Sequence, residues 1–376
     1  MATPIYLDNA ATSFPKAVGV SDAVKHCLDA VAANIGRGSY QSCTDAGLTV
    51  LSVRERLAKS FGCTDLRRVI FTGGMTAALN MAIGGYVCEG DTVLLSSMEH
   101  NAVLRPLIAH GCTLLRIPSD DDGTMRLDRL AIDDWRAIRL CVCTHASNVS
   151  GTIQPIEALS DLCRAGGVPL VLDAAQTAGH LAIDMERLHL AALCLPAHKG
   201  LLGPQGLGML LLSDAFSEAL RPTVFGGTGS QSHSESMPRY LPDRFEAGTL
   251  NLPGIYGLSA ALDRFDPATF RAHERKLIRR FSEGVSSIGH IRVLGPKDPA
   301  ARVGVFAIDF LRRDNASVSD ALERDYGILT RCGLHCAPEA HKTLHSFPQG
   351  AVRFSFSPAT TEREIDAAVE AIRALA

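Results

Sequence analysis

The sequence predicts an α/β protein with a mainly parallel central sheet and a second, smaller α+β unit. Short apolar runs alternate with amphipathic stretches from about residue 45 to about residue 215, a spacing that favours a parallel sheet covered by helices on both faces. After about residue 256 a long charged stretch is followed by separate strand-like and helix-like runs. The chain of 376 residues is long enough for two domains or for one large α/β domain.

The individual elements follow from these runs and from the turns between them. In the first part, strands are expected over 69–71, 93–95, 140–144 and 170–172, and helices from near Thr76 and over about 101–110 and 155–164. In the second part, helices are expected over about 267–288, 318–326 and 362–375, and strands over about 303–310 and 352–355. We expect the N-terminal segment to pack with the second part.

The composition is that of a globular protein and argues against several classes of partner. The chain is 46% hydrophobic and 20% charged with a formal net charge of −3, so neither nucleic acid nor an anionic membrane is expected. No apolar run approaches the roughly 18 residues of a membrane span, and the N-terminus lacks the pattern of a signal peptide. The eleven cysteines are odd in number and scattered, which indicates reduced thiols and a cytoplasmic location.

A lysine stands between a short apolar run and a turn rich in Gly and Pro, in the segment from Ala197 to Pro204. Lysine side chains are normally solvated, so Lys199 has one interpretation as a surface loop residue. The other interpretation is a desolvated amine that can form an imine with an aldehyde cofactor. The segment alone leaves both open.

A carboxylate, Asp173, directly follows the apolar run 170–172. In open α/β sheets the ligand crevice lies beyond the carboxyl ends of the strands. A helix N-cap is the alternative role for an Asp at this place. Pyridoxal 5'-phosphate (PLP) needs a carboxylate that keeps its pyridine nitrogen protonated. Asp173 and Lys199 lie one strand–turn–strand apart, and this pairing favours the cofactor interpretation.

Two further strand ends carry groups that suit the same cofactor. The segment from Phe71 to Thr76 has the pattern of a strand, a glycine turn and a helix start, where free N–H groups and the helix dipole bind phosphate. The turn lacks the Gly-Lys-Ser/Thr ending of a Walker motif, and many glycine turns are plain connections. At another strand end, His100 offers an imidazole that can stack on a flat ring.

Taken together, these segments resemble the class V aminotransferase-type PLP enzymes, specifically the cysteine desulfurase and selenocysteine lyase family. The resemblance covers nearly the whole chain and is carried by Tyr6 to Ala11, Phe71 to Asn80, Glu99-His100, His145 to Thr152, Asp173 to Gln176, His198-Lys199, Arg244 to Thr249 and Arg331 to Pro338. It implies the PLP-dependent transferase fold type I, with a large PLP-binding domain (15–255) on a seven-stranded sheet and a small domain (1–14 and 256–376). It also implies a homodimer with the active site at the subunit interface.

The resemblance also implies a role for each matching residue. Lys199 would carry PLP as a Schiff base and later move protons. The cofactor set would comprise Asp173 at the ring nitrogen, Gln176 at the ring oxygen and His100 on the ring face. Gly74, Thr76 and His198 of the same chain would hold the phosphate together with the partner subunit's Thr249. The substrate set would comprise Asn148 and Arg353 at the carboxylate, with Arg331 of the same chain and the partner subunit's Arg37 at the pocket entrance.

Cys336 falls where the group II members of this family keep their sulfur-accepting cysteine, within the motif Arg-x-Gly-His-His-Cys-Ala. The thiolate is the nucleophilic form of cysteine, and neighbouring His or Arg side chains favour it. His335 and Arg331 are the neighbours expected to do so here. A buried structural cysteine is the alternative, and Cys332 is a plausible example of one.

The same region has a second interpretation as a zinc site. Cysteine and histidine at short spacing bind zinc, and the segment contains Cys332, His335, Cys336, His341 and His345. Their spacing matches no standard zinc finger, and no second pair supports a fold around such a site. We therefore expect no metal.

Two positions depart from the family pattern. Pro196 stands where many members have a serine that donates to the phosphate, and proline offers neither a hydroxyl nor an N–H. Phosphate binding is therefore expected to depend on Thr76, His198 and backbone groups. At Leu334 a family histidine is missing, which bears on proton delivery at this loop.

The function that the resemblance implies is that of a PLP-dependent cysteine desulfurase. Cys336 would take the sulfur of L-cysteine as a persulfide, leave L-alanine, and pass the sulfur to an acceptor protein. Three alternatives stay open: a selenocysteine lyase, an aminotransferase or lyase that acts on another amino acid, and a non-enzymatic sulfur-relay protein that has lost PLP because of Pro196.

Overall fold

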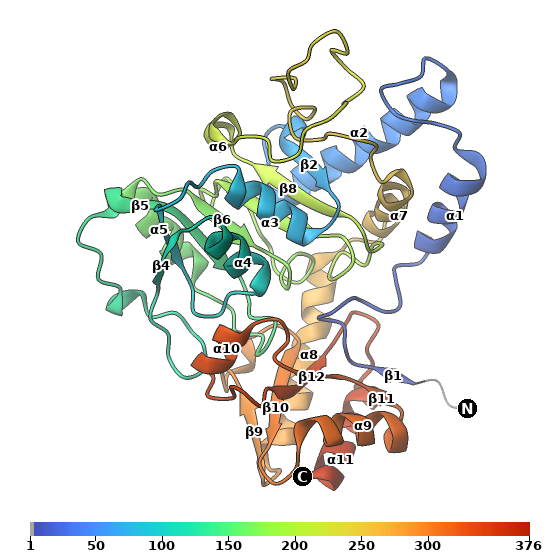
Figure 1. Ribbon diagram of the computed structural model, residues 1–376. Helices are drawn as coiled ribbons and strands as arrows, with labels where there is room; N and C mark the ends of the chain where they lie inside the picture. Colours follow the sequence, from blue (N-terminus) through green and yellow to red (C-terminus); the bar gives the residue numbers. More distant parts are fainter. Residues whose placement is uncertain (1–3) are drawn as a thin grey trace.

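A seven-stranded sheet forms the centre of the fold, with the strand order β2-β8-β7-β6-β5-β3-β4 (Figure 1). The computed structural model describes residues 4–376, so residues 1–3, which the sequence assigns to the small domain, lie outside the described residues. The strands are β2 (Val69–Thr72), β3 (Thr92–Leu95), β4 (Thr113–Arg116), β5 (Ile138–Thr144), β6 (Leu170–Asp173), β7 (Ala192–Pro196) and β8 (Gly208–Leu212). Strands β4, β3, β5, β6 and β7 pair in parallel, whereas β8 is antiparallel to both β7 and β2. The predicted seven-stranded, mainly parallel sheet is confirmed.

Successive strand residues point to opposite faces, and each face is covered by its own helices. Leu170 and Leu172 belong to one hydrophobic core, while Val171 belongs to the other. The first core includes α2 (Gln41–Phe61), α5 (Ile156–Gly166) and α7 (Leu252–Leu262), and the second includes α3 (Met75–Gly84), α4 (Asn101–Ala109) and α6 (Asp214–Ala219). Burial on both faces explains why the strands are continuous apolar runs in the sequence. Helix α1 (Val20–Ala30) packs against α7.

A second, antiparallel sheet lies in the C-terminal part of the chain, with the order β12-β13-β10-β9. Its strands are β9 (Ile291–Leu294), β10 (Val305–Phe310), β12 (Arg331–Gly333) and β13 (Ala351–Ser355). The helices of this part are α8 (Pro267–Ser286), α9 (Asn315–Tyr326), α10 (Pro338–Thr343) and α11 (Glu362–Leu375). Figure 1 shows α8 running from the central sheet down to this second sheet.

The N-terminal segment packs with the C-terminal part, as the sequence predicts. Strand β1 (Ile5–Tyr6) pairs in parallel with β11 (Ile328–Leu329), and Leu7 lies in the core formed by α8, α11 and the second sheet. In Figure 1 the blue N-terminal strand lies beside the red C-terminal elements. The domain division at residues 14/15 and 255/256 stays a prediction.

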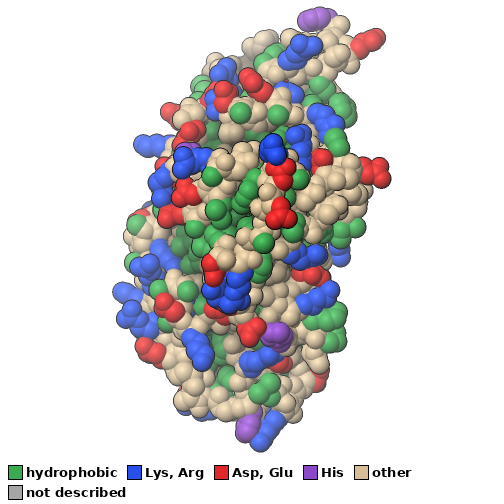
Figure 2. Space-filling view, turned by 90° about the vertical axis from the view of Figure 1, so that its left-hand side faces the viewer, with side chains coloured by type: hydrophobic (Ala, Val, Ile, Leu, Met, Phe, Trp, Pro, Cys, Tyr) green, Lys and Arg blue, Asp and Glu red, His purple; other side chains and the backbone are tan. Residues whose placement is uncertain are grey.

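The surface carries charges of both signs. On the face in Figure 2, Lys and Arg side chains are interspersed with Asp and Glu, and hydrophobic side chains gather in the middle. This mixture agrees with the small net charge of −3. Within residues 4–376, no helix combines the length and the apolar character needed to cross a bilayer.

Candidate functional site

A cavity of about 390 Å³ lies at the carboxyl ends of the parallel strands, where β5 ends at Thr144 and β6 ends at Asp173. Ligand crevices of open α/β sheets form at this edge. The cavity brings together most of the predicted site residues: Gly74, Thr76, His100, Asn148, Asp173, Gln176, His198, Lys199, Arg331 and Arg353. Cys336, Thr249 and Arg37 do not line it.

Lys199 lies in a tight turn after β7 and is not a solvated surface lysine. Its carbonyl accepts a hydrogen bond from Leu202 N at 2.8 Å, and Leu202 has a φ of 57°. Burial lowers the pKa of Lys199 to about 8, and the nearby Asp173 carboxylate opposes this shift. A substantial share of the Lys199 amine is therefore neutral near pH 7 to 8, the form that reacts with an aldehyde.

Asp173 is the last residue of β6 and is 3% exposed. Its Oδ1 accepts a hydrogen bond from Ala175 N at 2.8 Å, and residues 174–180 form turns and no helix. The N-cap interpretation is therefore wrong. Burial raises the pKa of Asp173, while the Ala175 N–H and the charge of Lys199 oppose this shift. A carboxylate in this environment gains from a cationic partner such as a protonated pyridine nitrogen.

His100 caps the N-terminus of α4, since its Nδ1 accepts a hydrogen bond from Ala102 N at 3.0 Å. Burial lowers the pKa of His100 to about 4, and the positive charge of Lys199 adds to the effect. The imidazole is therefore neutral, with its proton on Nε2 because Nδ1 accepts. Its ring is held by the helix cap beside the cavity.

A glycine turn forms one wall of the cavity at the start of α3. Gly74 has φ 140° and ψ 173°, a conformation that only glycine adopts readily. A Cβ added at Gly73 or Gly74 would meet nothing within 4 Å, which leaves open space over the turn. No side chain caps α3, so the first N–H groups of the helix are free to bind an anion.

The other predicted phosphate ligands lie near this turn. Thr76 is in the first turn of α3 and is exposed. His198 Nδ1 lies 3.0 Å from Thr12 Oγ1, and burial lowers the pKa of His198 to about 4. Pro196 is buried at the end of β7 opposite Gly208, a position that offers no donor.

Arg353, from β13, closes the cavity from the side of the second sheet and is 1% exposed. Its Nη1 donates to Asn148 O at 3.1 Å and its Nη2 to Asp8 Oδ1 at 2.5 Å. Burial lowers the pKa of Arg353, and the Asp8 carboxylate opposes this shift. The Asn148 side chain donates to His335 O at 2.7 Å. A buried guanidinium beside an amide suits a carboxylate ligand.

Gln176 Nε2 donates to Ala10 O at 3.1 Å.

Cys336 lies on an exposed turn next to the cavity, between β12 and α10. Arg331, which lines the cavity, donates through Nη2 to Cys336 Sγ at 3.5 Å. The expectation for His335 is wrong, because its ring nitrogens contact Arg331 O and His341 and not the thiol. Cys332 is half-buried. Within residues 4–376, no group of three or more His, Cys, Asp or Glu is arranged to hold a metal ion.

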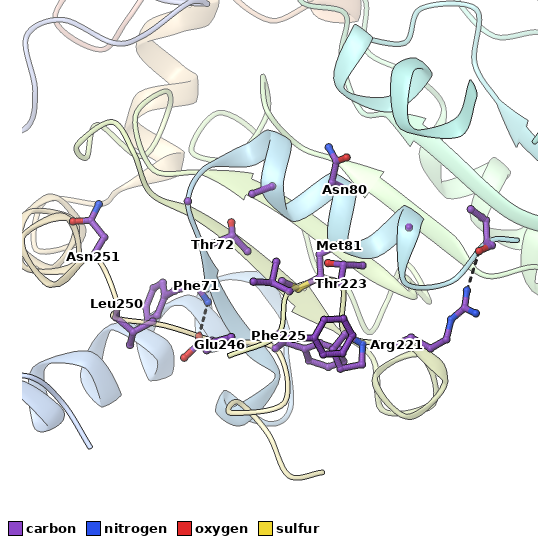
Figure 3. Close-up of a pocket in the computed structure, with 18 of the residues that line it drawn as sticks. Phe71, Thr72, Asn80, Met81, Arg221, Thr223, Phe225, Glu246, Leu250 and Asn251 are labelled. Atoms are coloured by element: carbon purple, nitrogen blue, oxygen red, sulfur yellow. Dashed lines mark hydrogen bonds between the residues drawn. The ribbon is translucent and has the colours of Figure 1, made fainter. Parts of the chain in front are cut away.

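Thr249 and Arg37 lie away from the cavity of their own chain. Thr249 lines a larger cavity of about 1310 Å³, shown in Figure 3, between α3 and the segments around Phe225 and Leu250. The two cavities share Gly73 and Ala77. Arg37 Nη2 donates to Gly227 O at 3.2 Å. Their assignment to the pocket of a partner subunit stays a prediction.

Two acidic residues of the site were not predicted from the sequence. Asp8 pairs with Arg353 across 345 positions of the chain, a distance that no local pattern reveals. Glu99 is fully buried next to His100, and its Oε1 accepts from Thr144 N at 2.9 Å. Burial raises the pKa of Glu99 to about 8. The sequence signal that could have identified Glu99 is its position beside His100, shortly after an apolar strand.

The residues present fit PLP. The cavity combines an amine with a lowered pKa (Lys199), a buried carboxylate (Asp173) and an open glycine turn at a helix start (Gly74). PLP offers an aldehyde, a pyridine nitrogen and a phosphate to these three groups. Lys199, Asp173 and the start of α3 would hold it.

Comparison with known proteins agrees with this site. A family model described as aminotransferase class-V matches residues 5–368. A probable cysteine desulfurase from Methanothermobacter thermautotrophicus is 31% identical over 99% of this chain and 94% of its own length. A cysteine desulfurase from Salmonella gallinarum is 32% identical over 88% of this chain and 84% of its own length. The solved apo cysteine desulfurase from Thermococcus onnurineus is 28% identical with a TM-score of 0.90, over 99% of this chain and 94% of that one. The chain therefore belongs to the aminotransferase class-V family, as its sequence motifs predict.

Proposed function

We propose that this protein is a PLP-dependent cysteine desulfurase that converts L-cysteine to L-alanine and takes up the sulfur on Cys336. The observation that carries the proposal is the position of Cys336 on an exposed turn, where its Sγ accepts from Arg331, a residue of the Lys199 cavity. The similarity to proteins named cysteine desulfurase supports the same reaction.

Four residues of the cavity have a defined task in this reaction. When bound, PLP supplies an aldehyde for the substrate amine and a ring that stabilises negative charge at the substrate Cα. Lys199 Nζ accepts a proton from this Cα, which its pKa of about 8 permits. Asp173 holds the ring nitrogen protonated. Arg353 and Asn148 orient the substrate carboxylate.

Cys336 completes the transfer as a nucleophile. Its Sγ attacks the sulfur of the bound cysteine, so that an S–S bond forms as the Cβ–S bond breaks. The electron pair of the broken bond remains on the substrate fragment, which takes up one proton at Cβ, regains one at Cα and leaves as alanine. The products are alanine and a Cys336 persulfide, and no external oxidant is needed. The exposed turn leaves the persulfide accessible to a sulfur-acceptor protein.

A homodimer and a cytoplasmic location belong to the same proposal. Thr249 and Arg37 lie outside the cavity of their own chain, and Val224 and Phe225 beside the larger cavity are 54% and 73% exposed. A second copy that covers this face would protect the apolar side chains and bring Thr249 of the partner subunit to the phosphate. The eleven cysteines are all free, which suits a reducing compartment.

Three other functions use the same residues differently. A selenocysteine lyase would use the same cavity, and a direct comparison of the two substrates distinguishes it. An aminotransferase or lyase for another amino acid would not need Cys336. A sulfur-relay protein without PLP is disfavoured, because the glycine turn and the Lys199–Asp173 pair are intact despite Pro196.

Replacement of Cys336 tests the proposal. We expect Cys336→Ala to retain the visible absorption of bound PLP, while sulfide release from cysteine falls about 100-fold, since a methyl group cannot accept sulfur. Cys332→Ala is the matched control and should change the rate by less than about twofold. Activity of Cys336→Ala on selenocysteine alone would still agree, because selenide leaves more easily. Full sulfide release by Cys336→Ala would refute the proposal.

A further inference from the structure

Behind the Cys336 turn, two buried imidazoles and a buried hydroxyl form a chain of hydrogen bonds. His335, His341 and Ser346 are 2%, 0% and 2% exposed. His335 Nε2 lies 3.1 Å from Arg331 O, His335 Nδ1 lies 3.2 Å from His341 Nε2, and His341 Nδ1 lies 2.8 Å from Ser346 Oγ. The chain therefore links the start of β12, the turn itself, α10 and the segment after α10.

The direction of every bond in this chain follows from one group, the carbonyl of Arg331. A carbonyl only accepts, so His335 Nε2 carries the proton and the neutral His335 accepts at Nδ1. His341 Nε2 must then donate, and His341 Nδ1 accepts from the Ser346 hydroxyl. Burial lowers the pKa of His335 well below its usual value and that of His341 to about 4. Both imidazoles are therefore neutral at pH 7, as this arrangement requires.

The turn that the chain supports has an unfavourable backbone conformation. His335 and Cys336 have φ angles of 50° and 56°, which side-chain-bearing residues rarely adopt. Such a conformation persists only where the surroundings fix it. The backbone carbonyls of these residues are held by Asn148 Nδ2 at 2.7 Å and by Asn101 N at 2.8 Å. The His335 ring, anchored through His341 and Ser346, is a further attachment.

We propose that His341 and Ser346 are positioning residues that fix the Cys336 turn through the His335 ring, so that Cys336 Sγ stays beside Arg331 and the cavity. This inference rests on the proposed function only for the role of Cys336. Neither His341 nor Ser346 lines the cavity, so both act through the turn and not on the substrate. Without the chain, His335 keeps a buried ring nitrogen with no partner, and the turn loses the attachment made through this nitrogen.

Four variants and one control test this inference in the PLP-loaded protein. His341→Leu removes both hydrogen bonds while it keeps an apolar group in a fully buried place, and His341→Gln retains a donor and an acceptor. Ser346→Ala removes the terminal donor, and Ser346→Thr restores a hydroxyl. The control is His345→Asn, because His345 is exposed and its side chain bonds, among residues 4–376, only to the exposed Asp121. Its φ of 54° is one that asparagine tolerates.

Two measurements are made on each variant. The first is the rate of hydrogen exchange of the backbone amides in 331–337, and the second is the yield of Cys336 persulfide after one exposure to cysteine. We expect the amides of 331–337 to exchange about tenfold faster in His341→Leu and Ser346→Ala, with unchanged exchange in β6 and unchanged PLP absorption. Ser346→Thr, His341→Gln and His345→Asn should exchange more nearly like the unmodified protein. Persulfide yield should fall in the same two variants.

Several results would overturn the inference. If the amides of 331–337 exchange at the same rate in His341→Leu and Ser346→Ala as in the unmodified protein, the hydrogen-bond chain does not fix the turn. If the amides of β6 exchange faster in these variants by the same factor as those of 331–337, the substitutions lower the stability of the whole protein and have no local role at the turn. If His341→Leu does not fold, the pair Ser346→Ala and Ser346→Thr decides by the same criterion. An unmodified protein that forms no persulfide would refute the proposed function, while the exchange data would still decide whether the chain fixes the turn.

Discussion

Lys199 and Asp173 are titratable groups that burial shifts in opposite directions within one cavity. Desolvation disfavours the charged form of each, so the pKa of Lys199 falls to about 8 and that of Asp173 rises. The charge of each opposes the shift of the other. The chemistry of a pyridine aldehyde uses both groups. It needs a lysine amine that is easily deprotonated and a carboxylate that is stabilised by a cation.

The lowered pKa of Lys199 predicts the pH dependence of cofactor binding. The neutral amine is the form that reacts with an aldehyde, and its fraction rises with pH through the pKa. We expect the rate at which cofactor-free protein acquires the absorption of PLP bound to Lys199 to increase with pH and to reach half its maximum near pH 8. Lys199→Ala should lose this absorption change and should no longer be trapped by borohydride. A half-maximum above about pH 10, the ordinary lysine value, would contradict the assigned environment.

The side chains that local patterns could predict are those at or shortly after the end of a strand. Asp173 at the end of β6, His100 beyond β3 and Lys199 beyond β7 could be assigned because strand ends gather at one edge of a parallel sheet. Asp8, which pairs with Arg353, could not be assigned, since the two residues meet through a parallel bridge between Asp8 and Ser355 of β13, far apart in the sequence. The same holds for His341, whose role depends on the conformation of the turn.

At the scale of single elements, the start of α3 determines whether an anion can bind. Gly74 adopts φ 140° and ψ 173°, and the space above it is open. A Cβ on Gly208 would lie 2.4 Å from Gly74 C, so the absence of a side chain there lets β8 approach the turn. Two glycines, distant in sequence, thus shape one wall of the cavity.

Substitution of Gly74 tests this element. We expect Gly74→Ala to lower the free energy of unfolding by about 1–3 kcal/mol, because alanine is strained in this conformation, and to weaken PLP binding. Gly73→Ala is the control for the unfolding measurement, since its backbone is not in the left-handed region and its added Cβ meets no atom within 4 Å. Thermal unfolding checks both variants, and PLP titration checks Gly74→Ala. Equal effects of the two substitutions on unfolding would mean that backbone conformation is not what Gly74 provides.

The positions of strands were more predictable than their directions. The runs 69–71, 170–172 and 352–355 all lie within observed strands, because fully buried strands are apolar on both faces. The run Gly208–Leu212 forms β8, which was not predicted, since a short apolar run alone does not distinguish a strand from a buried helix. Its antiparallel direction is set by the turn 197–207, which also presents Lys199. Helix α9 begins earlier than expected because Asp314 caps it by accepting from Ser317 N.

At the scale of the whole molecule, the cavity is assembled from both parts of the chain. The central sheet contributes Asp173 and Lys199, while the second sheet contributes Arg331 and Arg353. The contact of Arg353 with Asp8 and Asn148 ties the N-terminal segment and the central sheet to the second sheet. In the proposed function, the Cys336 turn, which follows strand β12 of the second sheet, would take up sulfur beside a cofactor held at the first sheet. Cofactor binding and sulfur uptake would then be divided between the two sheets.

The most direct test of the central claim is the location of the sulfur after reaction. The unmodified, PLP-loaded protein is treated with cysteine in the absence of acceptor and reductant, and its peptides are analysed by mass spectrometry. The account predicts one added sulfur on the peptide that contains Cys336, formed together with alanine. Added sulfur on Cys332 instead, or alanine formed with no added sulfur on any of the eleven cysteines, would contradict it.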